Sequence, residues 1–498
     1  MASSDHTDAL ERPASPAAST ATDHANFADA AARLLEEKGW TQAADEMAPW
    51  LSDWRGRYHG RALGLAAPAS TAEVAALVKL CAQHRVPIVP QGGNSGMAGG
   101  ATPDDSGAAI LLSLRRMNRI RRIDASAGQA LCEAGVILQT LHEAATEADM
   151  RFPLTLGGKG SATVGGLIST NAGGTQVLRH GTMRAQVLGM EAVLADGSVL
   201  DALTVLKKDN RGFDLKQLLI GSEGTLGIVT AATLRLLPAP RARATAWIGL
   251  AALPDARALL RRLERAMGDS LEGFEIVPAR CLANVVAHLP GARAPLTGTH
   301  QWNALVECVS AEGSDAELRE RLQNALAQAA DEALLEDATI AASEAQAEAL
   351  WTLRDSISEA ERALGPAMQH DISVPVENMP EFILAATPAI EEAFTGTRAL
   401  AFGHLGDGNV HFHVIAPPGA VPDEWEEREG KEISAAVYDL VSEWGGSISA
   451  EHGIGQMKVG ELGRLGDPIA LDMMRRVKQA LDPRGLLNPG KLVPPRDR

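Results

Sequence analysis

The hydrophobic positions in the first part of the chain follow helical and strand-like spacings in turn. Residues 27–54 repeat with an amphipathic helical period. Ser70 and Glu73 stand three positions apart before a helical run, as in a capping box. Residues 86–90 and 108–114 are short, mostly aliphatic runs that predict strands. These patterns predict a unit in which short strands and helices are mixed.

This mixture continues to about Leu237, where Pro238, Pro240 and three nearby arginines indicate a boundary. Before the boundary, Asp196-Gly197 lies between two apolar runs and predicts a β-hairpin. Beyond it, the sequence predicts helices at residues 255–267, 315–335, 343–363 and 472–481, and strands at residues 304–309 and 400–415. Both halves are therefore expected to be α+β.

A chain of 498 residues is long enough for more than one domain. Residues 1–26 are rich in Ala, Ser, Thr and Asp and are expected to form a disordered tail. We expect a helical segment over residues 27–57, an N-terminal domain over residues 58–238 and a C-terminal domain over residues 239–498. The C-terminal domain is expected to be capped by a short helical segment at the end of the chain.

Charge and composition exclude several classes of protein. The formal net charge of −17 argues against nucleic acid and anionic membranes as partners. None of the four cysteines forms a CxxC pair, and no apolar run approaches the roughly 18 residues that would predict a membrane span. The first residues lack the apolar core of a signal peptide. A cytoplasmic enzyme is the expectation.

Glycine is concentrated in four segments, at residues 91–100, 157–174, 221–227 and 403–408. Successive glycines allow backbone N–H groups to converge on a diphosphate, although any one such segment is more often a turn. Several in one domain favour a large phosphorylated cofactor. No GxGxxG motif follows a strand and opens a helix, which makes a Rossmann NAD site unfavoured. Residues 485–491 have P-loop spacing, but Leu492 replaces the required Ser or Thr.

Three of these strings resemble a known family. PQGGNSG (90–96), GGLISTNAGG (165–174) and GSEGTLGIVT (221–230) resemble the PCMH-type FAD domain of vanillyl-alcohol-oxidase-type flavoproteins, which is built in two parts. GHLGDGNVHFHV (403–414), SAEHGIG (449–455) and LDPRGLLNPGK (481–491) resemble the branch of D-2-hydroxyglutarate dehydrogenase, D-lactate dehydrogenase and the glycolate oxidase subunit. The resemblance covers residues 58–493.

The resemblance implies an FAD-binding set and a non-covalent flavin, because the glycine loops contain no His or Cys for attachment. Its implied cofactor residues are Pro90, Gly92, Gly93, Asn94, Ser95, Gly96, Gly165, Gly166, Asn171, Gly173, Gly174, Glu223, Gly224 and Ile228.

Histidines gather around the predicted turn Gly406-Asp407-Gly408. His404 and His411 are expected to face each other across a hairpin, and His413 shares a strand face with His411. A histidine near a turn is more often only solvated. The resemblance nevertheless implies that His404, His411 and Glu451 bind a divalent metal, with Zn²⁺ favoured by this ligand set, and that His452 is the general base.

The substrate carboxylate needs a cation, and the resemblance implies Arg354 for this role, whereas a solvated ion pair is the simpler alternative. Ser358 lies one helical turn further on, and Lys458 is a weaker candidate. Two residues depart from the family pattern. Gln369 stands where a lysine is frequent, and His413 where an asparagine is common, so that His413 is expected to contact substrate or metal.

We therefore expect an FAD-dependent dehydrogenase that oxidises a D-2-hydroxy acid resembling D-2-hydroxyglutarate, D-lactate or glycolate to the 2-oxo acid. Its electron acceptor is expected to be an electron-transfer flavoprotein, a cytochrome or a quinone, and the chain is a possible homodimer. The alternatives are the catalytic FAD subunit of a glycolate-oxidase-like complex, an O₂-using oxidase and, with less support, a zinc hydrolase.

Overall fold

The strands between residues 40 and 113 form a small, mainly parallel sheet in the computed structural model, which describes residues 21–36 and 38–496. Its order is β1 (Trp40–Thr41), β2 (Gly64–Ala66), β4 (Ile110–Ser113) and β3 (Ile88–Gln91). Helices α1 (Ala21–Leu35) and α3 (Thr71–His84) cover it. The predicted cap of α3 is confirmed, because the Ser70 hydroxyl accepts the backbone N–H of Glu73.

A second, antiparallel sheet completes the N-terminal lobe and confirms its two-part construction. Its order is β5 (Ile120–Asp124), β6 (Gln129–Glu133), β10 (Ile228–Arg235), β8 (Val187–Val193) and β9 (Val199–Ala202). Strands β8 and β9 pair across Asp196-Gly197, as predicted. The shorter elements of this lobe are α2 (Ala44–Met47), α4 (Leu138–Glu147), β7 (Met150–Arg151), α5 (Val164–Thr170), α6 (Val177–His180), α7 (Met183–Gln186), α8 (Lys216–Leu219) and β11 (Leu237–Pro238).

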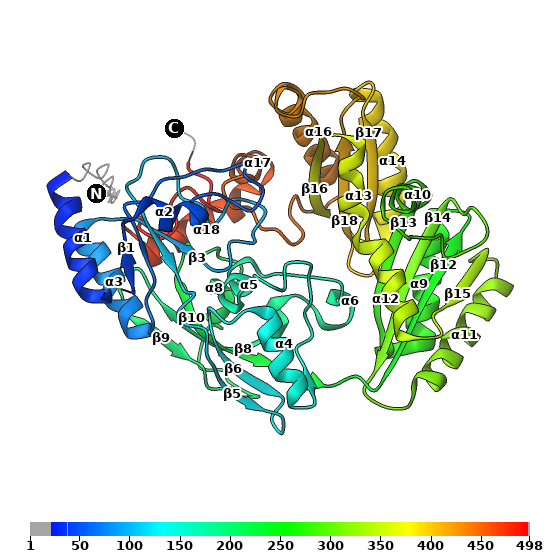
Figure 1. Ribbon diagram of the computed structural model, residues 1–498, viewed down its shortest axis with the longest axis horizontal. Helices are drawn as coiled ribbons and strands as arrows, with labels where there is room; N and C mark the ends of the chain where they lie inside the picture. Colours follow the sequence, from blue (N-terminus) through cyan, green and yellow to red (C-terminus); the bar gives the residue numbers. More distant parts are fainter. Residues whose placement is uncertain (1–20, 37, 497–498) are drawn as a thin grey trace, which may run out of the picture.

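The C-terminal lobe contains one antiparallel sheet of seven strands (Figure 1). Its order is β15 (Asp337–Ile340), β12 (Ala242–Leu250), β14 (Trp302–Ser310), β13 (Leu271–Pro278), β17 (Arg398–His404), β18 (Asn409–Ile415) and β16 (Ala367–Ser373). The helices of this lobe and the segment after it are α9 (Leu253–Met267), α10 (Ala279–His288), α11 (Asp315–Asp331), α12 (Glu344–Asp355), α13 (Ile357–Glu361), α14 (Met379–Ala393), α15 (Pro422–Trp425), α16 (Lys431–Glu443) and α17 (Val459–Leu465).

The two faces of this sheet differ in chemistry because side chains alternate along each strand. One face is apolar, with residues such as Ile276, Ala401 and Phe412, and packs against α9, α11, α14 and α16. The other packs against α10, α12 and α13, and carries His404, His411 and His413. We call it the polar face below.

Several sequence predictions differ from the structure, and the helical segment expected over residues 27–57 is one of them, because α1 ends at Leu35 and the short strand β1 follows. The helix predicted over residues 343–363 is interrupted at Ser356, which separates α12 from α13. The expectation of a disordered tail over residues 1–26 is wrong for residues 21–26, because these residues belong to α1. Residues 1–20 lie outside the described part of the chain.

The end of the chain does not cap the C-terminal domain as expected. Helix α18 (Pro468–Leu481) returns to the N-terminal lobe (Figure 1), where Val477 packs against its core. Lys478 donates to the carbonyl of Thr225, and Asn488 donates to the carbonyls of Gly100 and Glu223. Residues 468–493 therefore help to build the N-terminal lobe.

Glu272 on β13 joins the two lobes. Its buried carboxylate accepts both terminal nitrogens of Arg151 at 2.7 Å, Nη1 of Arg179 at 2.9 Å and the amide of Gln176 at 3.1 Å. Burial would raise the pKa of Glu272, but His180 and Arg151 outweigh it and hold the pKa well below its usual range. These partners lie on β7, on α6 and at the start of α6 in the other lobe, so this one carboxylate fixes the lobes together.

We predict that Glu272→Gln lowers the free energy of unfolding by about 3–5 kcal/mol, because it leaves buried guanidinium groups without their counter-charge. Urea unfolding followed by circular dichroism measures the effect. The lowered pKa of Glu272 gives a stabilisation that is present above the unfolded-state pKa of about 4.3 and is lost as the pH falls through the folded-state value. The difference between wild type and variant should therefore shrink below about pH 4.

Glu320→Gln on the exposed side of α11 is the matched control and should change stability by less than about 0.5 kcal/mol. Equal effects of the two substitutions would show that Glu272 has no special role in joining the lobes.

Candidate active site

The glycine-rich loop after β3 has the form of a diphosphate cradle. None of the backbone N–H groups of residues 92–96 donates a hydrogen bond to any described residue. Asn94 adopts a left-handed conformation with φ of 52°, which turns successive N–H groups toward one side. A Cβ on Gly93 would lie 1.6 Å from the carbonyl oxygen of Ser161, so the loop requires glycine there. Free N–H groups on a closely packed loop fit the pyrophosphate of FAD.

The second glycine segment brings the N-terminal lobe to the histidine cluster. A Cβ on Gly174 would lie 2.1 Å from the carbonyl oxygen of Thr155, and a Cβ on Gly173 would lie 3.0 Å from Oε1 of Glu451. The backbone here therefore touches a predicted metal ligand of the other lobe. The side chain of Asn171 accepts hydrogen bonds from Thr182 and Arg184, and so it holds the turn itself.

Glu223 links the lobes through its side chain. Its two carboxylate oxygens accept the N–H groups of Ile454 and Gly455, both at 2.7 Å. Gly224 packs against the ring of Pro90 with φ of 72°, and Ile228 is buried in the core of the first sheet. Glu223 therefore positions the loop that carries Glu451 and His452.

The hairpin of β17 and β18 forms as predicted, with its register shifted from the expected one. Phe402, rather than His404, pairs with His411, and His404 pairs with Asn409. His404 and His411 still share the polar face as diagonal neighbours, and their ring centroids lie 5.3 Å apart. Gly406 in the turn packs against Leu178 of α6, which holds the hairpin against the N-terminal lobe.

Glu275 on β13 orients two residues of the site. One oxygen accepts Nδ1 of His404 at 2.5 Å, and the other accepts Nε of Arg354 at 2.8 Å. Burial disfavours the charged form of His404, but Glu275 outweighs it and raises the pKa of His404 to about 9. With Nδ1 bound to a carboxylate, Nε2 of His404 is the atom free to bind a cation.

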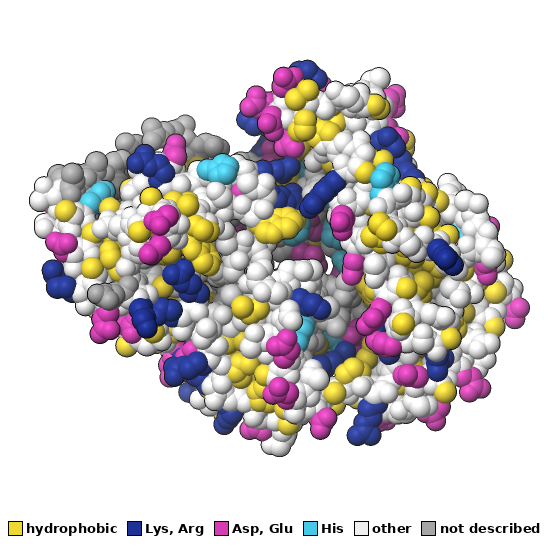
Figure 2. Space-filling view, viewed as in Figure 1, with side chains coloured by type: hydrophobic (Ala, Val, Ile, Leu, Met, Phe, Trp, Pro, Cys, Tyr) yellow, Lys and Arg dark blue, Asp and Glu magenta, His cyan; other side chains and the backbone are white. Residues whose placement is uncertain are grey.

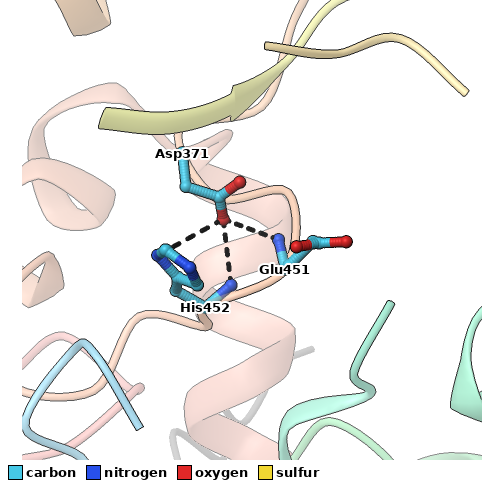
Figure 3. A group of neighbouring side chains, drawn as sticks. All are labelled: Asp371, Glu451 and His452. Atoms are coloured by element: carbon cyan, nitrogen blue, oxygen red, sulfur yellow. Dashed lines mark hydrogen bonds and ion pairs between the residues drawn. The ribbon is translucent and has the colours of Figure 1, made fainter. Parts of the chain in front are cut away.

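Asp371 on β16 has a similar role at the other end of the site (Figure 3). One of its oxygens accepts the backbone N–H groups of Glu451 and His452, at 2.8 and 3.0 Å. The same oxygen lies 3.7 Å from Nδ1 of His452, and the other lies 3.9 Å from Nδ1 of His411. In Figure 3 the Glu451 side chain extends to the side, away from the His452 ring. Asp371 thus faces both imidazoles and fixes the loop of Glu451 and His452.

These residues fit a divalent cation. Burial and the charge of His404 lower the pKa of His411 well below its usual value, which favours the neutral form that binds metals. Burial and Asp371 raise the pKa of Glu451 to about 7, a cost that a bound cation would relieve. Among the described residues, potential ligand atoms of Asp371, Glu451 and His452 lie within 4.8 Å of one another. Of the three predicted metal ligands, only Glu451 belongs to this group.

The predicted substrate residues divide into two groups. Arg354 and His413 lie on or over the polar face, where the guanidinium carbon of Arg354 is 5.3 Å from the Phe402 ring centroid. Lys458 is buried and donates to the carbonyls of Ile448 and Asp371, which makes it a support of the loop. Ser358 lies on α13 and is exposed.

Sequence reasoning missed four residues near the site: Glu275, Glu361, Asp371 and Arg55. Only Asp371, two positions after Gln369, carried a local signal, since period two places the two side chains on the same face. Figure 2 shows the surface hollowed between the lobes, with acidic and histidine side chains gathered there.

The chain matches two family models, the FAD binding domain over residues 62–203 and the C-terminal domain of FAD linked oxidases over residues 239–492. It is 37% identical to D-2-hydroxyglutarate dehydrogenase, mitochondrial, of Bos taurus over 456 residues, covering 90% of this chain and 80% of the relative. It is 35% identical to the Arabidopsis thaliana protein of the same name, covering 93% and 80%. The structure of p-cresol methylhydroxylase with substrate bound is 15% identical with a TM-score of 0.75, covering 96% of this chain and 98% of that one.

The fold and the matched domains define an FAD-dependent oxidoreductase, which confirms the expected cofactor class. The chain belongs to the family of FAD-linked oxidases, on the side of the D-2-hydroxyglutarate dehydrogenases.

The expectation of a cytoplasmic enzyme is wrong by this comparison, because both of these relatives are named mitochondrial. In the described part of the chain, no helix combines the length and apolar character needed to cross a bilayer.

We predict that Gly93→Ala loses bound flavin, because its Cβ would collide with the carbonyl of Ser161 and displace the diphosphate cradle. The ratio of flavin absorbance to protein absorbance in the purified chain measures this loss. Gly460→Ala is the control, since nothing lies within 4 Å of a Cβ there. Full flavin content in Gly93→Ala would contradict the assigned role of this loop.

Proposed function

We propose that the chain is a dehydrogenase that oxidises a D-2-hydroxy acid to the 2-oxo acid in the hollow between its lobes. One observation carries the proposal: the Glu451 carboxylate of the histidine cluster lies against Gly173 of the FAD lobe. The relatives' names supply the substrate class, a 2-hydroxy acid of D configuration. Groups that suit alcohol deprotonation thus adjoin the lobe that binds FAD.

Oxidation of a secondary alcohol requires loss of the hydroxyl proton and of a hydride from the same carbon. When bound, FAD accepts the hydride, and a divalent cation, which we propose to be Zn²⁺, stabilises the developing alkoxide. In this proposal His404, His411 and Glu451 hold the cation, and Arg354 offers its terminal nitrogens to the substrate carboxylate. We further propose that FAD is bound non-covalently and that its electrons pass to a flavoprotein, a cytochrome or a quinone.

His452 is the proposed general base. Burial lowers its pKa against the opposing effect of Asp371, so the imidazole is neutral and can accept a proton near pH 7. The Asp371 oxygen 3.7 Å from Nδ1 stabilises the imidazolium that forms. Because Asp371 also binds the His452 backbone N–H, the base has a fixed position over the substrate site.

A panel of D- and L-2-hydroxy acids with an artificial dye acceptor tests the proposed function. We expect dye reduction by at least one D-acid and not by its L-enantiomer. A colourless purified protein, or the absence of dye reduction by every D-acid, would exclude it. Peroxide formation in air without dye would indicate an oxidase instead.

We predict that His452→Gln keeps its flavin but loses about 10²–10⁴-fold in kcat, because the substrate proton has no acceptor. Steady-state dye reduction measures kcat, and the absorption spectrum measures the flavin. His288→Gln, on the exposed surface of α10, is the matched control and should behave as wild type. A His452→Gln enzyme with near-normal kcat would remove this residue from the mechanism.

We predict that dialysis against a strong chelator abolishes activity while the flavin spectrum persists, because the cation and the FAD have separate ligands. Elemental analysis should find about one divalent ion per chain before dialysis and none after it, and Zn²⁺ should restore activity. The His404→Gln variant should contain no bound divalent ion when it is purified. Metal-free protein of full activity would eliminate the proposed cation.

A further inference from the structure

Glu361 is a buried carboxylate that the proposed mechanism does not use. It ends α13, has an exposed fraction of 1% and contacts two side chains of the polar face. Its Oε2 accepts Nδ1 of His413 at 2.6 Å, and its Oε1 accepts the amide N–H of Gln369 at 3.1 Å. Glu361 therefore fixes the orientation of both side chains.

This cluster lies beside the site of reaction. Gln369 pairs with His413 across β16 and β18, two residues from the pair of Asp371 and His411. Two residues along a strand span about 7 Å, the reach of a short carbon tail. The centroid of the buried Phe402 ring lies 5.2 Å from the ring centroids of both His411 and His413, and so Phe402 packs the two pairs together.

The polarity of this surface differs from that of a site for a second carboxylate. Arg354, whose guanidinium carbon lies over the Phe402 ring, already has Glu275 as its counter-charge. The amide of Gln369 gives its N–H to Glu361, and its carbonyl oxygen has no hydrogen bond to any residue that the structure describes. What this end of the site offers a ligand is the Gln369 carbonyl oxygen, an acceptor, because Glu361 holds the amide N–H and pairs its other oxygen with His413.

We propose that Glu361 is a specificity-determining residue, which makes the pocket select 2-hydroxy acids with a neutral, hydrogen-bond-donating tail over those with a second carboxylate. An amide or hydroxyl tail donates to the Gln369 carbonyl. A carboxylate tail can only accept hydrogen bonds, so it would face the Gln369 carbonyl with no donor between the two oxygens. The inference rests on the proposed function and deepens it by naming the class of tail.

The test compares kcat/KM for D-2-hydroxyglutarate and for its 5-amide, with the flavin-loaded full chain and a dye acceptor. We expect wild type to prefer the amide by at least about 10-fold, the effect of about 1.4 kcal/mol. Glu361→Gln should shift the ratio toward the dicarboxylate by about 10-fold, mainly through KM, because tail contacts are equal in ground and transition states. Glu359→Gln removes the same charge from the exposed side of α13 and should leave the ratio unchanged.

Gln369→Lys is a second variant, which keeps Glu361 and places a cation beside it. It should also shift the ratio toward the dicarboxylate by at least about 10-fold, since a cation binds the second carboxylate. Flavin content and circular dichroism identify a variant that fails to fold, and the other variant then decides the question.

A wild type that prefers the dicarboxylate overturns the inference. So does a Glu361→Gln enzyme that changes kcat/KM for both acids by the same factor, because that result indicates a purely structural role. Oxidation of D-lactate with neither five-carbon acid accepted also overturns it, while leaving the proposed function intact. Only the failure of every D-2-hydroxy acid would count against the proposed function itself.

Discussion

The site depends on two buried glutamates that cross between the lobes in opposite directions. Glu272 extends from the C-terminal sheet to arginines of the N-terminal lobe, and Glu223 extends from the N-terminal lobe to the loop of Glu451 and His452. Leaving either carboxylate without partners in a dry interface would be costly, so the lobes are held in one arrangement. That arrangement brings Glu451 against Gly173, and without it the histidine cluster and the flavin loops would be two unrelated surfaces.

Within the C-terminal lobe, each imidazole of the polar face has a carboxylate behind it. Glu275 faces His404, Asp371 faces His411 and His452, and Glu361 faces His413. A carboxylate behind an imidazole fixes which nitrogen carries the proton and therefore which nitrogen is free. In the proposed mechanism this arrangement lets a chain of net charge −17 bind an acid, because each carboxylate is turned to an imidazole and the substrate meets Arg354 and the proposed cation.

Local patterns predicted those parts of the fold that short-range contacts decide. The cap at Ser70, the hairpin at Asp196-Gly197 and the turn at residues 406–408 each depend on a few adjacent residues. The supporting carboxylates could not be found in this way, because Glu275 and His404 are 129 positions apart and Glu361 and His413 are 52 apart. The break at Ser356 was missed because apolar periodicity continues across it, from Leu353 to Ile357. The register of β17 and β18 was off by two residues, which keeps side chains on the same face and so preserves the cluster.

Residues that carry the family resemblance and residues that we propose to select among substrates lie in different parts of this site. The strings that carry the family resemblance contain the residues that we propose to act next to the reacting carbon, namely His404, His411, Glu451 and His452. These groups act on the hydroxyl that every 2-hydroxy acid shares. Glu361 lies outside those strings and at the other end of the surface, where substrates differ from one another. Relatives that share the reaction can therefore differ in the acid they oxidise, because in our proposal the carboxylate at that end decides which side of an amide meets the tail, while the chemistry beside the flavin stays the same.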